Sequence, residues 1–131
     1  MTIELDAPAL RIGSVLILED EPLISAVMED VLLDLGASKV HVCVSPAHAL
    51  DVIEDHDLHV AILDVLVGDG TSARVADELD ARGVPFFFAS ATSRDAIEER
   101  HRHRPLLGKP FSNAQLTEFV SGTARRAGSA D

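Results

Sequence analysis

The stretch Val15-Leu16-Ile17-Leu18-Glu19-Asp20-Glu21 decides the fold prediction, because four apolar residues run directly into three acids. Similar apolar runs follow at residues 60–63, 86–89 and 106–107. None of these runs alternates with polar residues, so both faces of each strand are expected to be buried, as in a parallel sheet covered by helices. Residues 39–44 (KVHVCV) do alternate, which predicts an edge strand with one wet face.

Helical patterns separate these strands. The first helix is expected over residues 22–35, ended by Gly36, on apolar residues spaced four apart: Leu23, Val27, Val31 and Leu35. Further helices are expected to open at Ser45-Pro46, at Thr71 (to about Arg82), at Ser93 and at the capping box Ser112-x-x-Gln115 (to about Arg126).

A strand followed by a helix, repeated five times, is typical of an α/β protein. Short connections and right-handed crossovers favour a doubly wound parallel sheet of five strands with helices on both faces. We expect one domain over residues 13–126, an N-terminal extension over 1–12 and a C-terminal tail over 127–131.

Composition narrows the function classes. The 131 residues include 22 acidic and 11 basic ones, a net charge of −11 that disfavours nucleic-acid binding. Cys43 is the sole cysteine, so no internal disulfide forms and a reducing compartment is expected; it is interpreted as a small core residue. No apolar run approaches the roughly 18 residues that span a membrane. The acidic N-terminus does not resemble a secretion signal, so we expect a cytoplasmic protein.

Chemically useful side chains follow four of the strands, at the edge where such sheets bind ligands. Glu19-Asp20 follows the first strand, Asp64 the third, Ser90 the fourth, and the fifth leads into Lys109. With the strand order 2-1-3-4-5 the three carboxylates converge, and they repel one another unless a cation lies among them. An oxygen-only cluster suits Mg²⁺.

Each of these residues has an ordinary structural explanation when taken alone. Acids and hydroxyls after strands usually cap helices, and a lone Lys-Pro usually lies in a loop. The four features occurring together, in chain order, favour a functional site.

With these motifs the chain resembles a receiver domain of the response regulators of two-component signalling, over about residues 13–126. The resemblance implies a flavodoxin-like (βα)₅ fold with strand order 2-1-3-4-5. It also implies Mg²⁺-dependent phosphorylation of one aspartate by a histidine kinase or a histidine phosphotransferase. Such a protein is a switch that accepts phosphate and slowly hydrolyses it, and it is not a turnover enzyme.

The resemblance assigns a role to each matching position: Asp64 as phosphoacceptor, Asp20 as a metal ligand, Glu19 as a ligand directly or through water, the Leu66 backbone carbonyl as the remaining protein ligand, and Ser90 and Lys109 as contacts of the phosphoryl group. The Lys109-Pro110 peptide bond is expected to be cis.

Two positions depart from the usual receiver pattern. Gly68 stands where proline is common, so the loop 67–70 is expected to be mobile. Leu106 stands where many receivers have a switching aromatic, so coupling through that aromatic is not expected. The segments 88–91 (FASA) and 105–111 (PLLGKPF) instead resemble a stand-alone subgroup with Phe-Ala-Thr-Gly and Pro-x-Leu-x-Lys-Pro-Phe.

Charge is distributed unevenly along the chain. Residues 1–90 hold four basic and 17 acidic residues, whereas residues 91–131 hold seven basic and five acidic ones. The basic run within 98–104 has two interpretations: favourable charge at a helix C-terminus, or a docking surface. The docking surface would comprise residues 93–104, the strand 106–107 and the last helix, and would bind a downstream protein or a second copy.

Several sequence features suggest functions other than that of a receiver. Asp69-Gly70-Thr71 echoes a phosphatase signature, but the nucleophile would fall at Val67, which has no nucleophilic atom. A flavin module is disfavoured because Glu19-Asp20-Glu21 would repel its phosphate, and the pairs His56/His59 and His101/His103 lack further zinc ligands. A binding module that is never phosphorylated, or a receiver fragment of a larger hybrid kinase or regulator, stays open. The initial Met1 and the polar tail favour a stand-alone chain without an output domain.

Overall fold

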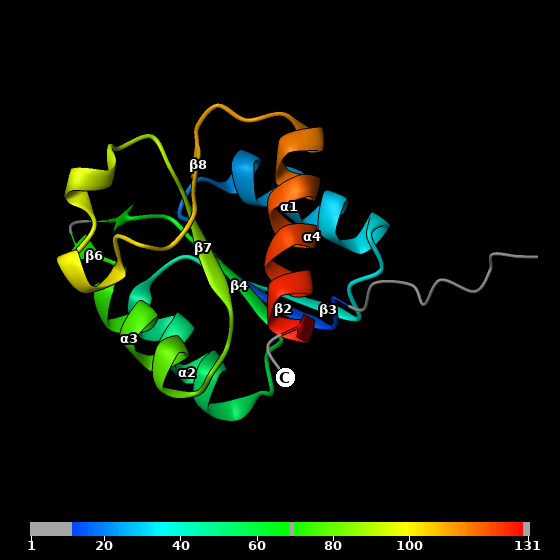
Figure 1. The fold of residues 1–131 in the computed structure, drawn as a ribbon, viewed down its shortest axis with the longest axis horizontal. Helices are drawn as coiled ribbons and strands as arrows, with labels where there is room; N and C mark the ends of the chain where they lie inside the picture. The colour runs from blue at the N-terminus through cyan, green and yellow to red at the C-terminus, as the bar shows by residue number, and fades with distance from the viewer. Residues whose placement is uncertain (1–11, 69, 130–131) are drawn as a thin grey trace, which may run out of the picture.

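The four apolar runs and the alternating segment pair as one parallel sheet in the order β3-β2-β4-β7-β8 (Figure 1). The computed structural model describes residues 12–68 and 70–129, the last three by their backbone only. The sheet strands are β2 (Ser14–Leu18), β3 (Lys39–Cys43), β4 (Val60–Leu63), β7 (Phe86–Ser90) and β8 (Leu106–Gly108). Numbered along the chain, this is the predicted order 2-1-3-4-5, with the alternating strand at one edge. The predicted fold class is confirmed.

The strand register brings the ends of the central strands level. Leu18, the last residue of β2, lies opposite Cys43 on one side and Leu63 on the other. The residues that follow β2 and β4 therefore leave the sheet side by side, before either chain turns into its next element.

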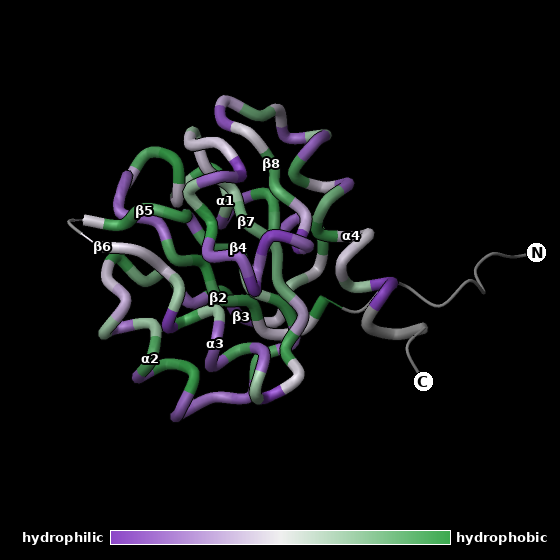
Figure 2. Tube along the Cα trace, turned by 60° about the vertical axis from the view of Figure 1, so that its left-hand side comes forward, coloured by the Kyte–Doolittle hydropathy of each residue, from purple (hydrophilic) through white to green (hydrophobic). Residues whose placement is uncertain are grey.

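Helices cover both faces of the sheet: α1 (Pro22–Asp34), α2 (Pro46–Asp55), α3 (Ala73–Ala81) and α4 (Asn113–Ser129). In Figure 1, α1 and α4 lie on one face and α2 and α3 on the other. Two apolar cores result, because successive strand residues point to opposite faces: Leu16 and Leu18 pack toward α2 and α3, whereas Val15 and Ile17 pack toward α1 and α4. Figure 2 shows the apolar strands inside and polar segments outside.

The predicted helix ends are confirmed at three positions. The Ser45 Oγ accepts a hydrogen bond from the His48 N–H at 3.2 Å, and Gly36, with φ +98°, follows the end of α1. In the capping box, Ser112 and Gln115 each bond the other's backbone N–H, at 3.1 and 2.8 Å. The third helix begins at Ala73, with Ser72 at its N-cap, and Thr71 Oγ1 accepts from the Ala73 N–H.

The buried face of α1 differs from the prediction. Leu23 is 81% exposed and Val27 47% exposed, and the buried residues of the helix are Ser25, Met28, Val31 and Leu32. A strict spacing of four drifts around a helix by about 40° per step, because a turn holds 3.6 residues. Along the predicted stripe Val31 is therefore buried, whereas Val27 and Leu23, nearer the N-terminus of α1, turn outward and are exposed.

The helix expected from Ser93 does not form, and that prediction is wrong. Two 3₁₀ turns, η1 (Arg94–Ala96) and η2 (Glu99–His101), connect β7 to β8 instead. Ile97 is the sole large apolar residue of the segment 93–104, so a helix there would have no apolar stripe to bury. Arginine side chains bind its free carbonyls: Arg94 donates to the carbonyls of Arg102 and Arg104, and Arg102 to that of Ile97.

A short antiparallel hairpin follows β4, where a loop was expected. It comprises β5 (Leu66–Val67) and β6 (Gly70–Thr71), and Gly68 has φ +62° in its turn. Asp69 lies outside the described residues, so the expected mobility of this loop stays a prediction.

The outer segments show two further features. The predicted extension 1–12 lies outside the described residues except for Ile12, which is buried in the core with α1 and α4. Helix α4 continues to Ser129, past the expected end near Arg126.

Cys43 is a buried core residue as interpreted, and burial raises the pKa of its thiol to about 11. Among the described residues, none of the helices has the length and apolar character needed to cross a membrane.

Candidate functional site

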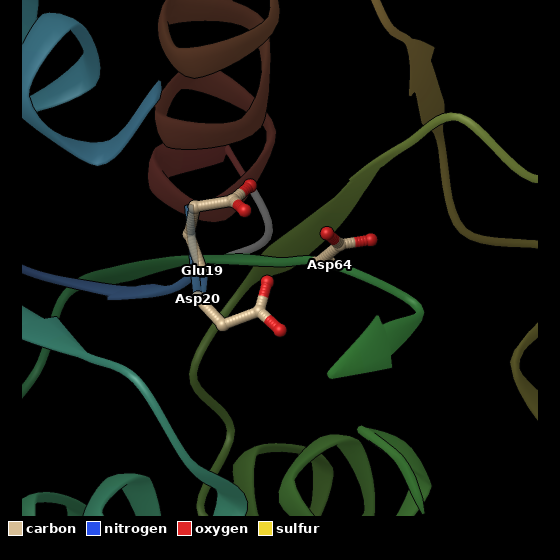
Figure 3. Close-up of side chains that lie close together, drawn as sticks. All are labelled: Glu19, Asp20 and Asp64. Atoms are coloured by element: carbon tan, nitrogen blue, oxygen red, sulfur yellow. The ribbon is translucent and has the colours of Figure 1, made fainter. Parts of the chain in front are cut away.

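Three carboxylates converge at the carboxyl ends of β2 and β4, as the sequence predicts. Glu19, Asp20 and Asp64 each offer an oxygen, and these atoms lie within 4.8 Å of one another (Figure 3). Backbone hydrogen bonds that continue the sheet hold two of the three residues: Glu19 N–H donates to the Cys43 carbonyl at 2.9 Å, and Asp64 N–H to the Leu18 carbonyl at 3.0 Å. The cluster is therefore positioned by the sheet itself.

Lys109 reaches into this cluster from β8. Its Nζ donates to Glu19 Oε1 at 2.6 Å and to Asp64 Oδ2 at 2.8 Å, and its own side chain is 13% exposed. The Lys109 N–H bonds the Ser90 carbonyl at 3.0 Å, which places the lysine beyond the end of β8. One ammonium faces three carboxylates, so the site has an excess of negative charge.

Burial and hydrogen bonding oppose each other in this site. Burial raises the pKa of Glu19, and the hydrogen bonds from Lys109 and the Glu21 N–H offset only part of that rise. Burial alone would lower the pKa of Lys109, but its hydrogen bonds to Asp64 and Glu19 outweigh burial, so that pKa is raised. An added cation would favour the ionised carboxylates.

The individual oxygens show where a cation fits. Both oxygens of Glu19 have partners, Lys109 for Oε1 and the Glu21 N–H for Oε2. Asp20 Oδ2 accepts from the Gly68 N–H at 3.0 Å, and Asp64 Oδ2 accepts from Lys109. Within the described residues, Asp20 Oδ1 and Asp64 Oδ1 have no hydrogen-bond partner. Two open carboxylate oxygens from two loops match the chemistry of a magnesium site.

Ser90 ends β7 and is 2% exposed. Its Oγ lies 2.9 Å from Thr92 Oγ1 and accepts from the Thr92 N–H at 3.3 Å. Sequence reasoning missed Thr92, although the spacing Ser-x-Thr is a local signal for hydroxyl–backbone hydrogen bonding. Leu66 opens β5, two residues past Asp64, and is 47% exposed. The Lys109-Pro110 peptide bond is cis, as predicted.

The basic run 98–104 makes contacts that neither sequence interpretation contained. Arg100 forms a two-pronged ion pair with Asp77 of α3 at 2.7 and 2.8 Å, and the buried His101 lies 2.7 Å from the same carboxylate. Arg104 pairs with Asp80 and lies over the Phe86 ring. The helix-end interpretation is wrong, since the segment contains only 3₁₀ turns. These side chains attach the segment to α3.

The histidine pairs do not assemble into a metal site within the described ranges. His101 contacts Asp77, and His59 Nδ1 accepts a hydrogen bond from the Ser14 N–H at 3.0 Å. The acids Glu19, Asp20 and Asp64 are the one cluster of metal-ligating type that the described residues contain.

A surface pocket of about 390 Å³ adjoins the acidic cluster. Apolar residues of α1 form one wall, and the segment after β8 forms the other: Leu23, Ile24 and Val27, with Ala91, Lys109, Pro110 and Phe111. Leu23 and Val27, which are exposed on α1, thus lie beside the lysine that contacts Asp64.

Comparison with known proteins finds similar sequences and similar structures. No family model matches the chain. The phyllosphere-induced regulator PhyR of Methylorubrum extorquens is 32% identical over 111 residues, which are 82% of this chain but 42% of PhyR. SdrG from Sphingomonas melonis Fr1 is 39% identical, with a TM-score of 0.75 over 86% of this chain and 96% of SdrG.

A more distant structure shares the fold. The receiver domain of the sensor histidine kinase PA1611 from Pseudomonas aeruginosa, determined with a magnesium ion in its active-site cleft, is 21% identical. It superposes with a TM-score of 0.70 over 86% of this chain and 97% of that domain.

Proposed function

The chain belongs to the receiver-domain family of two-component signalling, and on that premise we propose that Asp64 accepts a phosphoryl group from a histidine kinase or a histidine phosphotransferase. The observation that carries this proposal is the contact of Asp64 with Lys109 inside a cluster of three acids. Asp64 is buried, yet one of its oxygens has no partner among the described residues, so its carboxylate is open to an incoming ligand on that side.

The residues present fit a magnesium ion. Asp20 and Asp64 would bind it through their open Oδ1 atoms, the Leu66 carbonyl would add a third ligand, and Glu19, whose oxygens are both engaged, would act through water. A bound Mg²⁺ supplies positive charge that neutralises the transferring phosphoryl oxygens. The ion in the PA1611 receiver domain supports this assignment.

The transfer itself needs little beyond positioning. A carboxylate oxygen of Asp64 forms a bond to phosphorus while the phosphorus–nitrogen bond of the phosphohistidine breaks, and the imidazole keeps the electron pair. Lys109, already 2.8 Å from Asp64, would pair with a phosphoryl oxygen, and the Ser90 hydroxyl would donate to another. Water later cleaves the acyl phosphate, so the protein resets without being a turnover enzyme.

We propose that the apolar pocket beside the site is the surface to which the phosphohistidine protein binds. The phosphohistidine must come within bonding distance of Asp64, so its carrier must cover the adjoining surface, and Lys109 lines both the pocket and the site. Leu23, at 81% exposure, would bury its side chain against an apolar helix face of the donor.

Replacing Leu23 with Glu tests this docking surface. The L23E variant should lose about tenfold or more of the phosphotransfer rate from a kinase or phosphotransferase, because it would bury a charge. Labelling by acetyl phosphate should be unchanged, since that donor needs no protein surface. Leu33→Glu is the matched control, since Leu33 is also exposed on α1 but does not line the pocket. Equal losses in both variants would contradict the assignment.

Phosphorylation is proposed to switch binding of a downstream protein or of a second copy, through the surface of residues 93–104, β8 and α4. Arg100 and Arg104 are already paired with α3, so this surface has less free positive charge than the sequence suggests. Because this chain spans 42% of PhyR, the same receiver acting within a longer protein is the second candidate.

Intact-mass measurement after exposure to acetyl phosphate and Mg²⁺ tests the central proposal. The wild-type protein should gain the mass of one phosphoryl group, and Asp64→Asn should gain none while keeping its circular dichroism spectrum. Labelling of the variant would exclude Asp64 as the acceptor. An unlabelled, folded wild type, with no labelling from kinases either, would favour a binding module that is never phosphorylated.

A further inference from the structure

We propose that Thr92 is a positioning residue for phosphoryl transfer, acting through Ser90. Its hydroxyl and its backbone N–H both hydrogen-bond the Ser90 Oγ and leave that hydroxyl able only to donate. This inference rests on the proposed function and deepens it, because it names a residue of the same site to which no role has been given above.

The geometry of the two residues is specific. Ser90 Oγ lies 2.9 Å from Thr92 Oγ1, and the Thr92 N–H donates to Ser90 Oγ at 3.3 Å. Ser90 is 2% exposed, and its carbonyl accepts the Lys109 N–H at 3.0 Å. The Ser90 backbone is therefore fixed by β8, and its side chain is held by the residue two positions on.

The hydrogen-bonding capacity of a serine hydroxyl gives this contact a direction. A hydroxyl has one proton to donate and two lone pairs that accept. The Thr92 N–H occupies one lone pair of Ser90 Oγ, and the Thr92 hydroxyl occupies the other when it donates. Ser90 then has its proton left, and a phosphoryl oxygen is an anionic acceptor that takes protons and offers none.

The pair also responds to what occupies the site. Without phosphate, either hydroxyl can donate to the other across the 2.9 Å contact. A phosphoryl oxygen beside Ser90 selects one arrangement, in which Thr92 donates to Ser90 and Ser90 donates to phosphate. Hydroxyls in a chain polarise one another, so the second bond strengthens the first.

Two substitutions at position 92 separate the hydroxyl from the rest of the side chain. Thr92→Val keeps the branched shape and removes the hydroxyl, so labelling of Asp64 by acetyl phosphate with Mg²⁺ should slow about fivefold, the loss expected for one hydrogen bond. Thr92→Ser keeps the hydroxyl and should restore the wild-type rate. If the valine variant melts at a lower temperature than wild type, Thr92→Ala replaces it as the variant that lacks the hydroxyl.

A double-mutant cycle tests whether Thr92 acts through Ser90. Ser90→Ala should slow labelling by at least as much as Thr92→Val, and the double variant should be no slower than Ser90→Ala alone. A purely structural role for Thr92 would instead give losses that multiply, and a serine variant no better than the valine one. Either result, or an unchanged rate in Thr92→Val, overturns the inference.

These outcomes are distinguishable from failure of the proposed function. If the wild-type protein is not labelled at Asp64, the proposal that Asp64 accepts phosphate fails and the role of Thr92 fails with it. If the wild type is labelled and Asp64→Asn is not, the phosphoacceptor proposal holds, and the rates at position 92 decide the inference alone.

Discussion

Among the described residues, two clusters of acids and cations can be compared, and they differ in burial and in charge balance. At the sheet edge, Glu19, Asp20 and Asp64 face one cation, Lys109, and the side chains of Glu19 and Asp64 are 2% and 10% exposed. On the outside of α3, Asp77 and Asp80 face Arg100, His101 and Arg104, and both carboxylates are more than 40% exposed. The first cluster has an excess of negative charge and, apart from the exposed Asp20, its carboxylates are buried. In the second cluster the carboxylates are exposed to water and each has an arginine partner.

The pKa shifts of the two clusters run in opposite directions. Burial raises the pKa of Glu19 despite its hydrogen bonds, whereas the hydrogen bond from Arg100 lowers the pKa of Asp77 to about 2. Buried excess charge destabilises a fold unless a ligand compensates it, so its presence indicates function. A matched, exposed cluster needs no ligand, and we interpret the α3 cluster as structural.

Removing one carboxylate from each cluster gives the largest expected contrast. Asp20→Asn should slow Mg²⁺-dependent labelling of Asp64 on the order of a hundredfold, because it removes one of the proposed metal ligands. Its stability should be unchanged or higher, since one repelling charge is gone. Asp77→Asn should label within about twofold of wild type and lose less than about 1 kcal/mol of unfolding free energy.

Both properties are measurable on the same samples, by intact-mass kinetics and by urea unfolding. A slow Asp77→Asn variant would show that the α3 cluster participates in transfer. Normal labelling of Asp20→Asn would remove the metal assignment at that position, and chelation of Mg²⁺ in the wild type then shows whether labelling needs a metal at all.

The sequence predicted the acidic cluster because it depends on strands that are easy to recognise. Runs such as 60–63 are apolar throughout, so their pairing and the position of Asp64 follow from general rules for parallel sheets. The segment 93–104 was predicted wrongly because its structure depends on long side chains reaching Asp77 and Asp80 of α3. Contacts between residues 23 or more positions apart are not visible in a local pattern.

Two other limits explain the error on α1 and the omission of Thr92. Leu23 and Val27 fit a helical stripe, but the direction of the stripe relative to the sheet is set by packing. The Ser90–Thr92 contact depends on where β7 ends, and helix and strand ends are the least certain part of a sequence prediction.

Replacing one cation in each cluster tests whether the two clusters contribute differently to the unfolding free energy. Lys109→Met leaves Glu19 and Asp64 without a counter-charge in a buried place, so it should lower the unfolding free energy by about 3 kcal/mol. Added Mg²⁺ should restore part of this loss, since the ion supplies the missing charge. Arg100→Met should change stability far less and show no response to Mg²⁺, because its pair with Asp77 is half exposed.

Thermal or urea unfolding, with and without about 10 mM Mg²⁺, measures the stability of both variants. The two clusters would be energetically alike if Arg100→Met were the more damaging change, or if Mg²⁺ stabilised both variants equally. In that case burial and charge balance would not distinguish a functional cluster from a structural one in this protein.

The smallest expected effect is the pH dependence of the α3 cluster. The folded pKa of Asp77 is lowered to about 2 from an ordinary value of 3.8, so the unfolded chain takes up its proton first as pH falls. The stability that Asp77 contributes is therefore complete above about pH 4 and is lost between about pH 4 and pH 2. The difference in unfolding free energy between wild type and Asp77→Asn should be below about 1 kcal/mol at pH 6 and should shrink toward zero through that window. Asp30→Asn, which removes an acid that has no ion pair among the described residues, controls for the general effect of one charge. A difference that persisted at pH 2 would mean that Asp77 stabilises the segment through neutral hydrogen bonds, and the cluster would then differ from the acidic cluster at the sheet edge in kind as well as in charge balance.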